Sequence, residues 1–397
     1  MKILFTSQPE YSHLIPIVLP LALLADKAGH DVVVATGTEM VPHLRSHHMN
    51  TLELLGVASI GSLVRSPERA QAIGFQLPVG DFGTATRIMP PEMYAIDFVG
   101  VLGSRFGRSL ITTLDGWQPD VIVRESTEFG GYLAAEYMGI SHAVIDLNPT
   151  APIGHPAFLA QINAEREVLG LPGVNEPSQV LGELRASFLP EAFYSSGEQV
   201  SEGCYYQLPS VEQDEAFDPE ILKWVNGRPL VLVSAGMAAS LVGEVGLLGT
   251  IISVLGDLPI AAVVVLDGDV AQEVRVAGLP ENVMMVPRIP QRAFLRHCSL
   301  LVSHGGFNSV VEALAAGVPG VAIPMTSEQA ELADRTSEFG VSTYLRLEDF
   351  SAEALWAMLS RAVADEAMIA RVNAVKQHIH SLPRPEQMLD DIAGFAS

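Results

Sequence analysis

The amino-acid sequence predicts an α/β protein of two successive doubly wound domains, each a parallel sheet covered by helices on both faces. Short, continuously apolar segments alternate with segments of helical periodicity, as expected for strands that are buried on both faces of a parallel sheet. The pattern occurs twice, beginning at KILFTS near the N-terminus and again at PLVLVSAG in the second half. With 397 residues, the chain is long enough for two domains.

In the first half, KILFTS precedes a helix that we expect from about His13 to Ala28, with Gly29 ending it. The later runs DVVVAT, PDVIVRE and SHAVIDL are predicted strands, and EFGGYLAAEYMG is a predicted helix. From about residue 148 to 226, prolines, glycines and acidic residues break the alternation, which indicates an insertion and a linker. We place the domain boundary near residues 208–219.

The second half repeats the alternation of strands and helices. After PLVLVSAG, the expected strands are IAAVVVL, VMMVP, LLVSHG, GVAIP and STYLR. The segment that begins PRPEQMLDD starts with two prolines and then has the pattern of a helix. A second parallel sheet with its own helices therefore follows the first.

The composition narrows the class of protein. The chain is 48% hydrophobic and 17% charged, with a formal net charge of -23. This charge repels phosphate backbones and anionic membrane surfaces, and no Lys/Arg cluster offsets it, so we expect no nucleic-acid partner and no membrane insertion. The N-terminal apolar runs lack the cleavage site of a secretory signal. Cys204 and Cys298 are too few for a disulfide framework or a metal cage, so we expect a cytoplasmic protein.

The stretch LVSHGGFNSVVEALAAGVPGVAIPMTSEQ places polar residues where two predicted strands end. Gly305 and Gly306 allow the backbone to approach a ligand closely, and the helix that starts there directs unpaired N–H groups at it. Such a site fits an anion, most simply a phosphate. Asn308 and Ser309 add side-chain donors, and Glu312, one turn further on, can accept hydrogen bonds from hydroxyls such as those of a ribose.

This stretch resembles the nucleotide-sugar motif of family 1 glycosyltransferases, and in particular of bacterial natural-product and macrolide enzymes. The residues that carry the resemblance are His304-Gly-Gly-Phe-Asn-Ser, Glu312, AGVP and the pair Glu328 and Gln329. The resemblance extends upstream into VPRIPQRAFLRHC and to SAG, which begins at Ser234. It is strong in the second half of the chain and diffuse in the first.

The resemblance implies an arrangement of the whole chain. Residues 1–210 would form an N-terminal acceptor-binding domain, and residues 220–375 would form the C-terminal domain that binds the nucleotide sugar. The segment 376–397 would return to the first domain as a helix. The implied fold is GT-B, in which two Rossmann-like domains face each other across a cleft.

The resemblance also assigns donor-binding roles. Two residues would flank the base, the His-Gly-Gly turn and the first helical turn would hold the diphosphate, Glu312 would bind the ribose hydroxyls, and an acid-amide pair would bind the sugar. The donor-binding residues implied in this way are Ser234, Arg288, Ile289, His304, Gly305, Gly306, Asn308, Ser309, Glu312, Glu328 and Gln329.

In the first domain, SHLIP resembles the family's Gly-His-x-x-Pro, in which the histidine is the general base that deprotonates the acceptor. His13 holds that place. Imidazole, with an unperturbed pKa of about 6.5, can accept a proton at neutral pH, but it needs an acid partner to orient it and stabilise its cation. Glu125 stands where the family has an activating Asp, and Glu128, one turn away, is the alternative partner.

Three positions depart from the family pattern. The loop before His13 carries Gln-Pro-Glu-Tyr, where relatives often have small residues. Met237 stands in place of a Ser or Thr, which removes a phosphate donor, and Arg288 stands in place of an aromatic platform, although a guanidinium can also stack on a base. The triplet DGD at Asp267 imitates a metal-binding Asp-x-Asp, but we interpret it as a turn.

We therefore expect an inverting, metal-independent glycosyl transfer from a UDP- or dTDP-sugar to a hydroxyl of a small hydrophobic acceptor. No metal and no cofactor other than the donor substrate are expected. The sequence does not decide between a monomer and a homodimer. The segment from Leu63 to Trp117, rich in Phe, Met and Leu, would form the acceptor wall, or alternatively a helix packed on the first domain. Two other functions stay open: a nucleotide-sugar epimerase or hydrolase of the same fold, and a non-catalytic subunit that binds a nucleotide sugar.

Overall fold

The computed structural model describes residues 1–76, 89–114, 116–147, 149, 151–194, 204–209, 217–234 and 245–396. These residues form two compact units. Unit 1 holds the described residues of Met1–Pro78, Met89–Ser210 and Leu382–Ser397, and unit 2 holds those of Val211–Ser381. The chain thus returns to unit 1 at Leu382, whereas the sequence placed this return at residue 376.

Unit 1 is built on a six-stranded parallel sheet with the order β3-β2-β1-β4-β5-β6. Its strands are β1 (Lys2–Thr6), β2 (Asp31–Gly37), β3 (Thr51–Leu54), β4 (Val121–Glu125), β5 (Ser141–Asp146) and β6 (Leu184–Ser187). The first strand is central, and Thr6 pairs with Ala35 on one side and Arg124 on the other. The strands β1 and β4 are buried almost throughout, as the continuous apolar runs predicted.

The sixth strand lies within the segment that we interpreted as an insertion and linker. β6 extends the sheet of unit 1 by pairing with β5, with Arg185 opposite Val144. The Arg185 side chain is paired with Asp146 at 2.7 Å. A charged residue in the middle of a short strand hides the apolar pattern, so the strand was not predicted.

The predicted first helix occurs as three consecutive parts, α1 (Tyr11–His13), the π-helical η1 (Leu14–Val18) and α2 (Leu19–Lys27). Pro16 lies inside the π-helical turn and Pro20 in the first turn of α2. Because proline has no N–H to donate, a change of helical hydrogen bonding is expected at such positions. Gly29, with a φ of 87°, ends the helix as predicted.

The other helical elements of unit 1 cover its sheet and lie in the connections. They are η2 (Thr38–Met40), α3 (Val41–Ser46), α4 (Ile60–Arg65), α5 (Pro67–Ile73), α6 (Pro91–Tyr94), η3 (Ala95–Gly103), α7 (Ser104–Thr113), α8 (Gly130–Met138), α9 (Pro156–Val168), η4 (Pro177–Val180) and η5 (Glu191–Phe193). The helices α7 and α8 approach closely at Gly107 and Gly130. A Cβ on Gly130 would lie 2.5 Å from the main-chain nitrogen of Gly107, so the absence of a side chain allows this approach.

Unit 2 repeats the architecture with the order β12-β11-β10-β7-β8-β9. Its strands are β7 (Leu230–Ser234), β8 (Ala261–Val265), β9 (Val283–Val286), β10 (Leu300–Ser303), β11 (Gly320–Ala322) and β12 (Ser342–Tyr344). Alternate residues of β7 enter different apolar clusters, with Val231 and Val233 on one face and Leu230 and Leu232 on the other. The predicted fold class, two doubly wound parallel-sheet domains, is confirmed.

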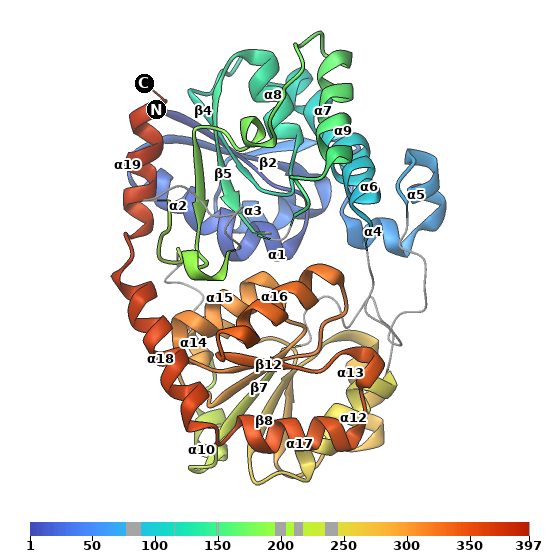
Figure 1. Cartoon of the computed structure of the whole chain (residues 1–397), viewed down its shortest axis with the longest axis vertical. Coiled ribbons are helices and arrows are strands. Elements are labelled where there is room, and N and C mark those ends of the chain that lie inside the picture. The colour runs from blue at the N-terminus through green and yellow to red at the C-terminus, as the bar shows by residue number, and fades with distance from the viewer. Residues whose placement is uncertain are drawn as a thin grey trace. The chain divides into compact units, whose positions relative to one another are not determined.

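Helices flank the sheet of unit 2, as Figure 1 shows. They are α10 (Glu220–Val225), α12 (Val245–Gly256), α13 (Gly268–Ala277), α14 (Gln291–Leu295), α15 (Phe307–Ala316), α16 (Ser327–Glu338), η7 (Leu347–Asp349), α17 (Ala352–Ala362) and α18 (Glu366–Ser381). Among the residues described, no helix has the length and apolar character needed to cross a membrane.

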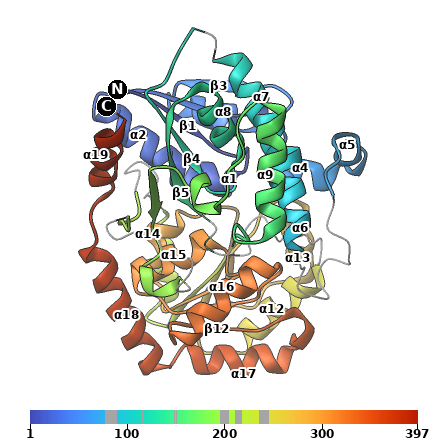
Figure 2. The ribbon, with the colours of Figure 1, turned by 45° about the horizontal axis from the view of Figure 1, so that its top comes forward.

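The final helix, α19 (Pro385–Phe395), belongs to unit 1 rather than to unit 2. It packs against α2, and Figures 1 and 2 show the red α19 beside the blue α2. Tyr206 donates its hydroxyl to Asp391 Oδ2 at 2.6 Å, and the Gln207 main-chain N–H donates to Pro383 at 2.8 Å. The last helix therefore covers the domain that contains the first strand.

Candidate active site

Both sheets have the same strand order, so both have a switch point between their first and fourth strands. In unit 1 the neighbours at this point are β1 and β4, and in unit 2 they are β7 and β10. Ligands of open parallel sheets bind outside the carboxyl ends of the strands at such a point. His13 follows β1 and Glu125 ends β4, while Ser234 ends β7 and His304 follows β10. The sequence-predicted residues thus occupy both switch points.

At the switch point of unit 1, His13 and Glu125 face each other. The His13 Nδ1 lies 3.3 Å from Glu125 Oε1 and 3.3 Å from the Thr127 hydroxyl. The carboxylate is fully buried, whereas the imidazole side chain is 25% exposed. Because Nδ1 is turned to the carboxylate, Nε2 is the ring nitrogen that can take a proton from a substrate.

The Glu125 carboxylate is held in its ionised form by its neighbours. Thr127 donates its main-chain N–H at 2.7 Å, and Gln8 donates its main-chain N–H at 3.3 Å. Burial alone would raise the pKa of Glu125, but His13 and the hydrogen bonds from Thr127 lower it below its ordinary value. A buried carboxylate that stays charged can orient the ring and stabilise its protonated form. Thr127 was not predicted, since a single threonine after a strand carries no sequence signal of its own.

Glu128, the alternative partner of His13, has a different environment. Its carboxylate accepts the Thr6 hydroxyl at 2.6 Å and the Gly131 main-chain N–H at 2.9 Å. Burial raises the pKa of Glu128 to about 7, against the lowering effect of Thr6, Arg124 and Gly131. A Cβ at Gly131 would lie 2.6 Å from the carboxylate, so glycine leaves room for it. Glu125, and not Glu128, is therefore the carboxylate that the structure places against His13.

The large residues of the loop before His13 pack into unit 1. Gln8, Pro9 and Glu10 are buried. Pro9 lies against Gly37, where an added Cβ would be 3.1 Å from the proline ring. Glu10 Oε1 accepts the main-chain N–H groups of the first two residues of α4. Pro9 and Glu10 thus have local partners, whereas the buried Gln8 Nε2 has no hydrogen-bond partner among the described residues.

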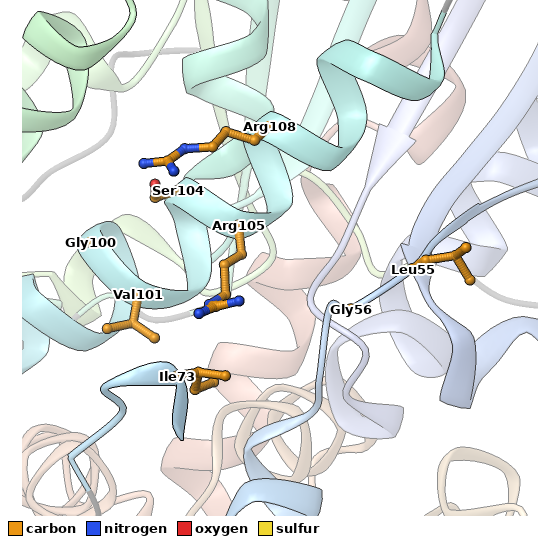
Figure 3. A pocket seen from close by; sticks show the side chains of 8 residues that line it. All are labelled: Leu55, Gly56, Ile73, Gly100, Val101, Ser104, Arg105 and Arg108. Atoms are coloured by element: carbon orange, nitrogen blue, oxygen red, sulfur yellow. The ribbon is translucent and has the colours of Figure 1, made fainter. Parts of the chain in front are cut away.

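A cavity of about 430 Å³ opens in unit 1 beside the end of β3. Figure 3 shows Arg105 pointing into the space between Val101, Ile73 and Gly56. The residues that line the cavity are Leu55, Gly56, Ile73, Gly100, Val101, Ser104, Arg105 and Arg108. Six of these belong to the predicted acceptor segment, of which residues 77–88 and 115 lie outside the described residues.

In unit 2, the His-Gly-Gly turn brings its imidazole over the start of α15. Gly305 has a φ of 76°, a conformation that favours glycine, and its Cβ would lie 3.1 Å from Ala322 Cβ. Gly306 is the N-cap of α15, and a Cβ there would lie 2.3 Å from His304 Nε2. The two glycines add no side chain of their own at this helix start, so backbone N–H groups and the His304 ring share the site that an anion would occupy.

The His304 ring is neutral at physiological pH. Burial lowers the pKa of His304 to about 4, and the hydrogen bond with the main chain of Ser234 opposes this effect. Its Nδ1 is buried and has no hydrogen-bond partner among the described residues. The single N–H of the neutral ring donates to the Ser234 carbonyl, so Nδ1 carries a lone pair and becomes a donor to an oxyanion only when it takes up a proton. The adjacent strand ends, Ser303 and Ser234, are paired in register, which explains why this histidine meets Ser234.

Glu312 is buried in α15 and is held by the neighbouring helix α14. Gln291 Nε2 donates to Glu312 Oε2 at 2.9 Å and lies 3.5 Å from the Ser309 hydroxyl. Arg292 lies 3.7 Å from the other carboxylate oxygen. Burial raises the pKa of Glu312, while Arg292 and Gln291 oppose it. Sequence reasoning gave Gln291 and Arg292 no role, although both lie in the PQR segment that carries the resemblance.

The predicted sugar-binding pair, Glu328 and Gln329, lies at the start of α16, which follows β11. Gln329 Oε1 accepts the Met325 main-chain N–H at 2.9 Å, so the amide nitrogen is the part of the group left for a ligand. Thr326 caps the helix by accepting the Gln329 main-chain N–H. Glu328 is half-buried in the same first turn.

The remaining predicted positions differ in exposure. Arg288 is exposed, whereas the Ile289 side chain belongs to an apolar cluster of unit 2, so a contact of Ile289 with a base would involve its main chain. Asn308 is half-buried in the first turn of α15. Asp267 caps α13 by accepting the Gly268 main-chain N–H at 2.8 Å, in agreement with a turn. Met237 lies outside the described residues.

Comparisons with known proteins agree with this fold. The structure of the glycosyltransferase VinC in complex with dTDP superimposes with a TM-score of 0.76 at 19% identity, covering 100% of this chain and 99% of VinC. Residues 250–394 match the family model of the erythromycin biosynthesis protein CIII-like C-terminal domain. The aklavinone 7-beta-L-rhodosaminyltransferase of Streptomyces galilaeus is 24% identical over 98% of this chain and 94% of its own.

A further relative is the NDP-glycosyltransferase YjiC of Bacillus licheniformis, 29% identical over 70% of this chain and 72% of its own. The chain is a glycosyltransferase of the GT-B fold. In this glycosyltransferase, the histidine of the first domain and the glycine turn of the second domain stand at equivalent switch points of two similar sheets.

Proposed function

We propose that this glycosyltransferase transfers a sugar from a nucleoside diphosphate sugar to a hydroxyl of a small, largely apolar acceptor, with inversion and without a metal ion. The observation that carries the proposal is the pair of His13 and Glu125 at the switch point of unit 1. A partly exposed imidazole on a buried, ionised carboxylate is suited to general-base catalysis.

In the proposed reaction, Nε2 of His13 takes the proton of the acceptor hydroxyl. The acceptor oxygen forms a bond to the anomeric carbon as the bond from that carbon to the diphosphate oxygen breaks on the opposite face. The nucleoside diphosphate leaves with the electron pair, and Glu125 stabilises the imidazolium. One displacement of this kind inverts the configuration at the anomeric carbon.

The proposed diphosphate site is the turn at Gly305 and Gly306 with the start of α15. Backbone N–H groups and the Asn308 and Ser309 side chains supply donors, and His304 would add one at Nδ1 when that nitrogen carries a proton, so charge on the leaving group can be stabilised without a metal. Glu312 would accept ribose hydroxyls with the lone pairs that Gln291 does not use. The dTDP bound to VinC and the name of the Bacillus relative support a nucleoside diphosphate donor, with UDP and dTDP both as candidates.

The proposed acceptor side is the cavity of unit 1. Leu55, Ile73 and Val101 give it an apolar lining, which suits a small hydrophobic acceptor. The relative named for aklavinone supports an acceptor of the natural-product class. Arg105 adds a guanidinium that could stack on an aromatic ring or bind an acidic group.

The proposal is tested with a panel of acceptors and of UDP- and dTDP-sugars, read by mass spectrometry. We expect an acceptor mass increased by one sugar residue, with and without EDTA. Free or isomerised sugar without a glycosylated product would instead support the hydrolase or epimerase. Dependence on added Mg²⁺ or Mn²⁺ would contradict the metal-free mechanism.

His13 is the residue to change first. His13→Ala should lower turnover by roughly 10²–10⁴-fold, because a general base contributes about that much, while donor affinity stays nearly constant. Turnover is measured at saturating donor, and donor affinity by calorimetry. Near-normal turnover of the variant would exclude His13 as the base.

A further inference from the structure

The loop between β1 and α1 contains a buried carboxylate, Glu10, which is 6% exposed. Its main-chain oxygen accepts the N–H groups of His13 at 3.1 Å and Leu14 at 3.0 Å. These two hydrogen bonds start the helical turn on which His13 lies. Glu10 is therefore joined to the candidate base through three residues of regular backbone.

The Glu10 side chain has its partners in a different part of unit 1. Oε1 accepts the main-chain N–H groups of Ile60 and Gly61, the latter at 3.3 Å. These are the first two residues of α4, whose N-cap is Ser59. Free N–H groups at a helix start attract an anion, so the carboxylate adds a second cap to α4 from fifty residues away.

The charged groups that face Glu10 come from two elements, α1 and η2. His13, on its own turn, attracts the carboxylate, and Glu39 of η2 repels it. Burial raises the pKa of Glu10, and His13 together with the N–H groups of Gly61 and Ile60 lowers it. Glu39 in turn accepts the Ser59 hydroxyl and lies 3.9 Å from Arg69 of α5. Attraction between Glu10 and His13 acts on both groups, so the carboxylate favours the protonated ring.

A neutral side chain could make the same contacts with α4. Glutamine has an oxygen in the same place and would accept both N–H groups without the cost of burying a charge. A buried carboxylate that serves only as a cap therefore carries a desolvation cost that glutamine would avoid. The N–H groups of α4 favour a negative charge by a modest amount, and a cation nearby would favour it further; the cation that a general base forms is the His13 imidazolium.

We propose that Glu10 is a positioning residue that supports the base with its charge and holds the acceptor side with its carboxylate oxygen. The segment between β3 and α4 connects the two roles, because Leu55 and Gly56 line the cavity while Ile60 and Gly61 bind Glu10. The inference rests on the proposed function, in which His13 is the base and the cavity takes the acceptor.

Two substitutions in the full-length protein separate the roles. Glu10→Gln keeps the oxygen and removes the charge, whereas Glu10→Asp keeps the charge and shortens the reach to α4. Glu68→Gln, which removes an exposed carboxylate from α5, is the control for a change in net charge. The His13 titration midpoint is followed by NMR, with its signal assigned by its loss in His13→Gln. The KM for the acceptor and the pH profile of kcat/KM are measured in parallel.

In Glu10→Gln we expect the His13 midpoint and the acid limb of the pH profile to fall by roughly half a unit to one unit. In Glu10→Asp both should stay in place, and the acceptor KM should rise by about three- to tenfold through loss of a hydrogen bond. Glu68→Gln should change neither quantity. An unchanged His13 midpoint in Glu10→Gln, or an unchanged acceptor KM in Glu10→Asp, overturns the proposal.

The two hypotheses fail in different ways. If wild-type protein glycosylates no acceptor, the proposed function fails, but the NMR titration still tests the link between Glu10 and His13. If Glu10→Gln does not fold, judged by circular dichroism, the Glu10→Asp variant decides the proposal through its acceptor KM. A stable Glu10→Gln variant with the wild-type His13 titration midpoint and wild-type kinetics would show that Glu10 serves only as a cap of α4.

Discussion

At the scale of single residues, two buried glutamates three positions apart have opposite electrostatic environments. Glu125 faces an imidazole and accepts two main-chain N–H groups, whereas Glu128 faces a hydroxyl and one N–H and lies close to Glu125. His13 and the hydrogen bonds from Thr127 hold the first ionised, whereas burial raises the pKa of the second to about 7 against the lowering effect of Thr6, Arg124 and Gly131. The two residues thus have distinct contacts, since Glu125 lies against His13 and Glu128 bridges β1 to α8.

Exchanging each glutamate for glutamine should change the pH dependence of stability in opposite directions. Glu125 has a lowered pKa when folded, so its stabilising effect is present above the unfolded pKa of about 4.5 and is lost as pH falls. Glu128 has a raised folded pKa, so its effect declines as pH rises from about 4.5 to about 7. With rising pH, Glu125→Gln should lose stability relative to wild type, and Glu128→Gln should gain it.

Urea unfolding of both variants and wild type, at intervals between about pH 3 and 7.5, measures these slopes, with the Glu125 change at the acid end and the Glu128 change between about pH 4.5 and 7. Glu68→Gln, which removes an exposed carboxylate from α5, is a third variant outside the switch point. Parallel curves for Glu125→Gln and Glu128→Gln would contradict the assignment of their environments.

At the scale of elements, the start of α15 is shaped by the absence of side chains. Gly306 is the N-cap, and the His304 ring occupies the space that its Cβ would need. The backbone N–H groups and the imidazole therefore face the same region, which a longer N-cap residue would not allow. The neighbouring helix α14 holds Glu312 of α15 through Gln291 and Arg292.

Gly306→Ala should weaken binding of a nucleoside diphosphate by tenfold or more, because the Cβ displaces His304 and a lost hydrogen bond to a charged group costs about 1.5–3 kcal/mol. Gly317→Ala, at the other end of the helix, is the matched control. Its φ of 75° makes alanine unfavourable by about 1 kcal/mol, so the free energy of unfolding should fall while the affinity for the nucleotide is unchanged. Calorimetry with UDP and dTDP measures affinity, and equal affinities for wild type and Gly306→Ala would refute the arrangement.

The sequence identified those features that depend on local pattern. The apolar strands, the glycine turn at His304 and the histidine after the first strand can be recognised from a few consecutive residues. Features that depend on contacts between distant segments were missed, among them Gln291 and Arg292 on Glu312, Thr127 on Glu125, and the strand that contains Arg185. Glu10 shows the reason clearly, since its partners Ile60 and Gly61 are brought to it only by the folded sheet.

At the scale of the whole molecule, unit 1 depends on a segment that follows unit 2 in the chain. The helix α19 buries Met388, Leu389 and Ile392, packs against α2, and binds Tyr206 through Asp391. The first domain is therefore completed by a distant part of the sequence, while unit 2 is built from residues that end at Ser381.

Removal of residues 382–397 should strongly destabilise unit 1. Full burial of a large apolar side chain contributes about 1.5–3 kcal/mol, so the loss of three is comparable with the total stability of a domain, about 5–15 kcal/mol. Differential scanning calorimetry should show a separate, earlier transition in the truncated protein. Tyr206→Phe, which removes only the hydrogen bond to Asp391, should cost about 1 kcal/mol. A truncated protein that melts like wild type would contradict this role of α19.

The position of α19 also has a consequence for the order of events on the ribosome. The strands of unit 1 emerge first, yet α2 lacks its cover until the segment after Ser381 has been translated. Unit 2 has all of its own strands and helices by that point. The nascent chain should therefore finish its second domain before its first, with an incomplete N-terminal domain exposing the apolar site for α19 throughout the synthesis of the other.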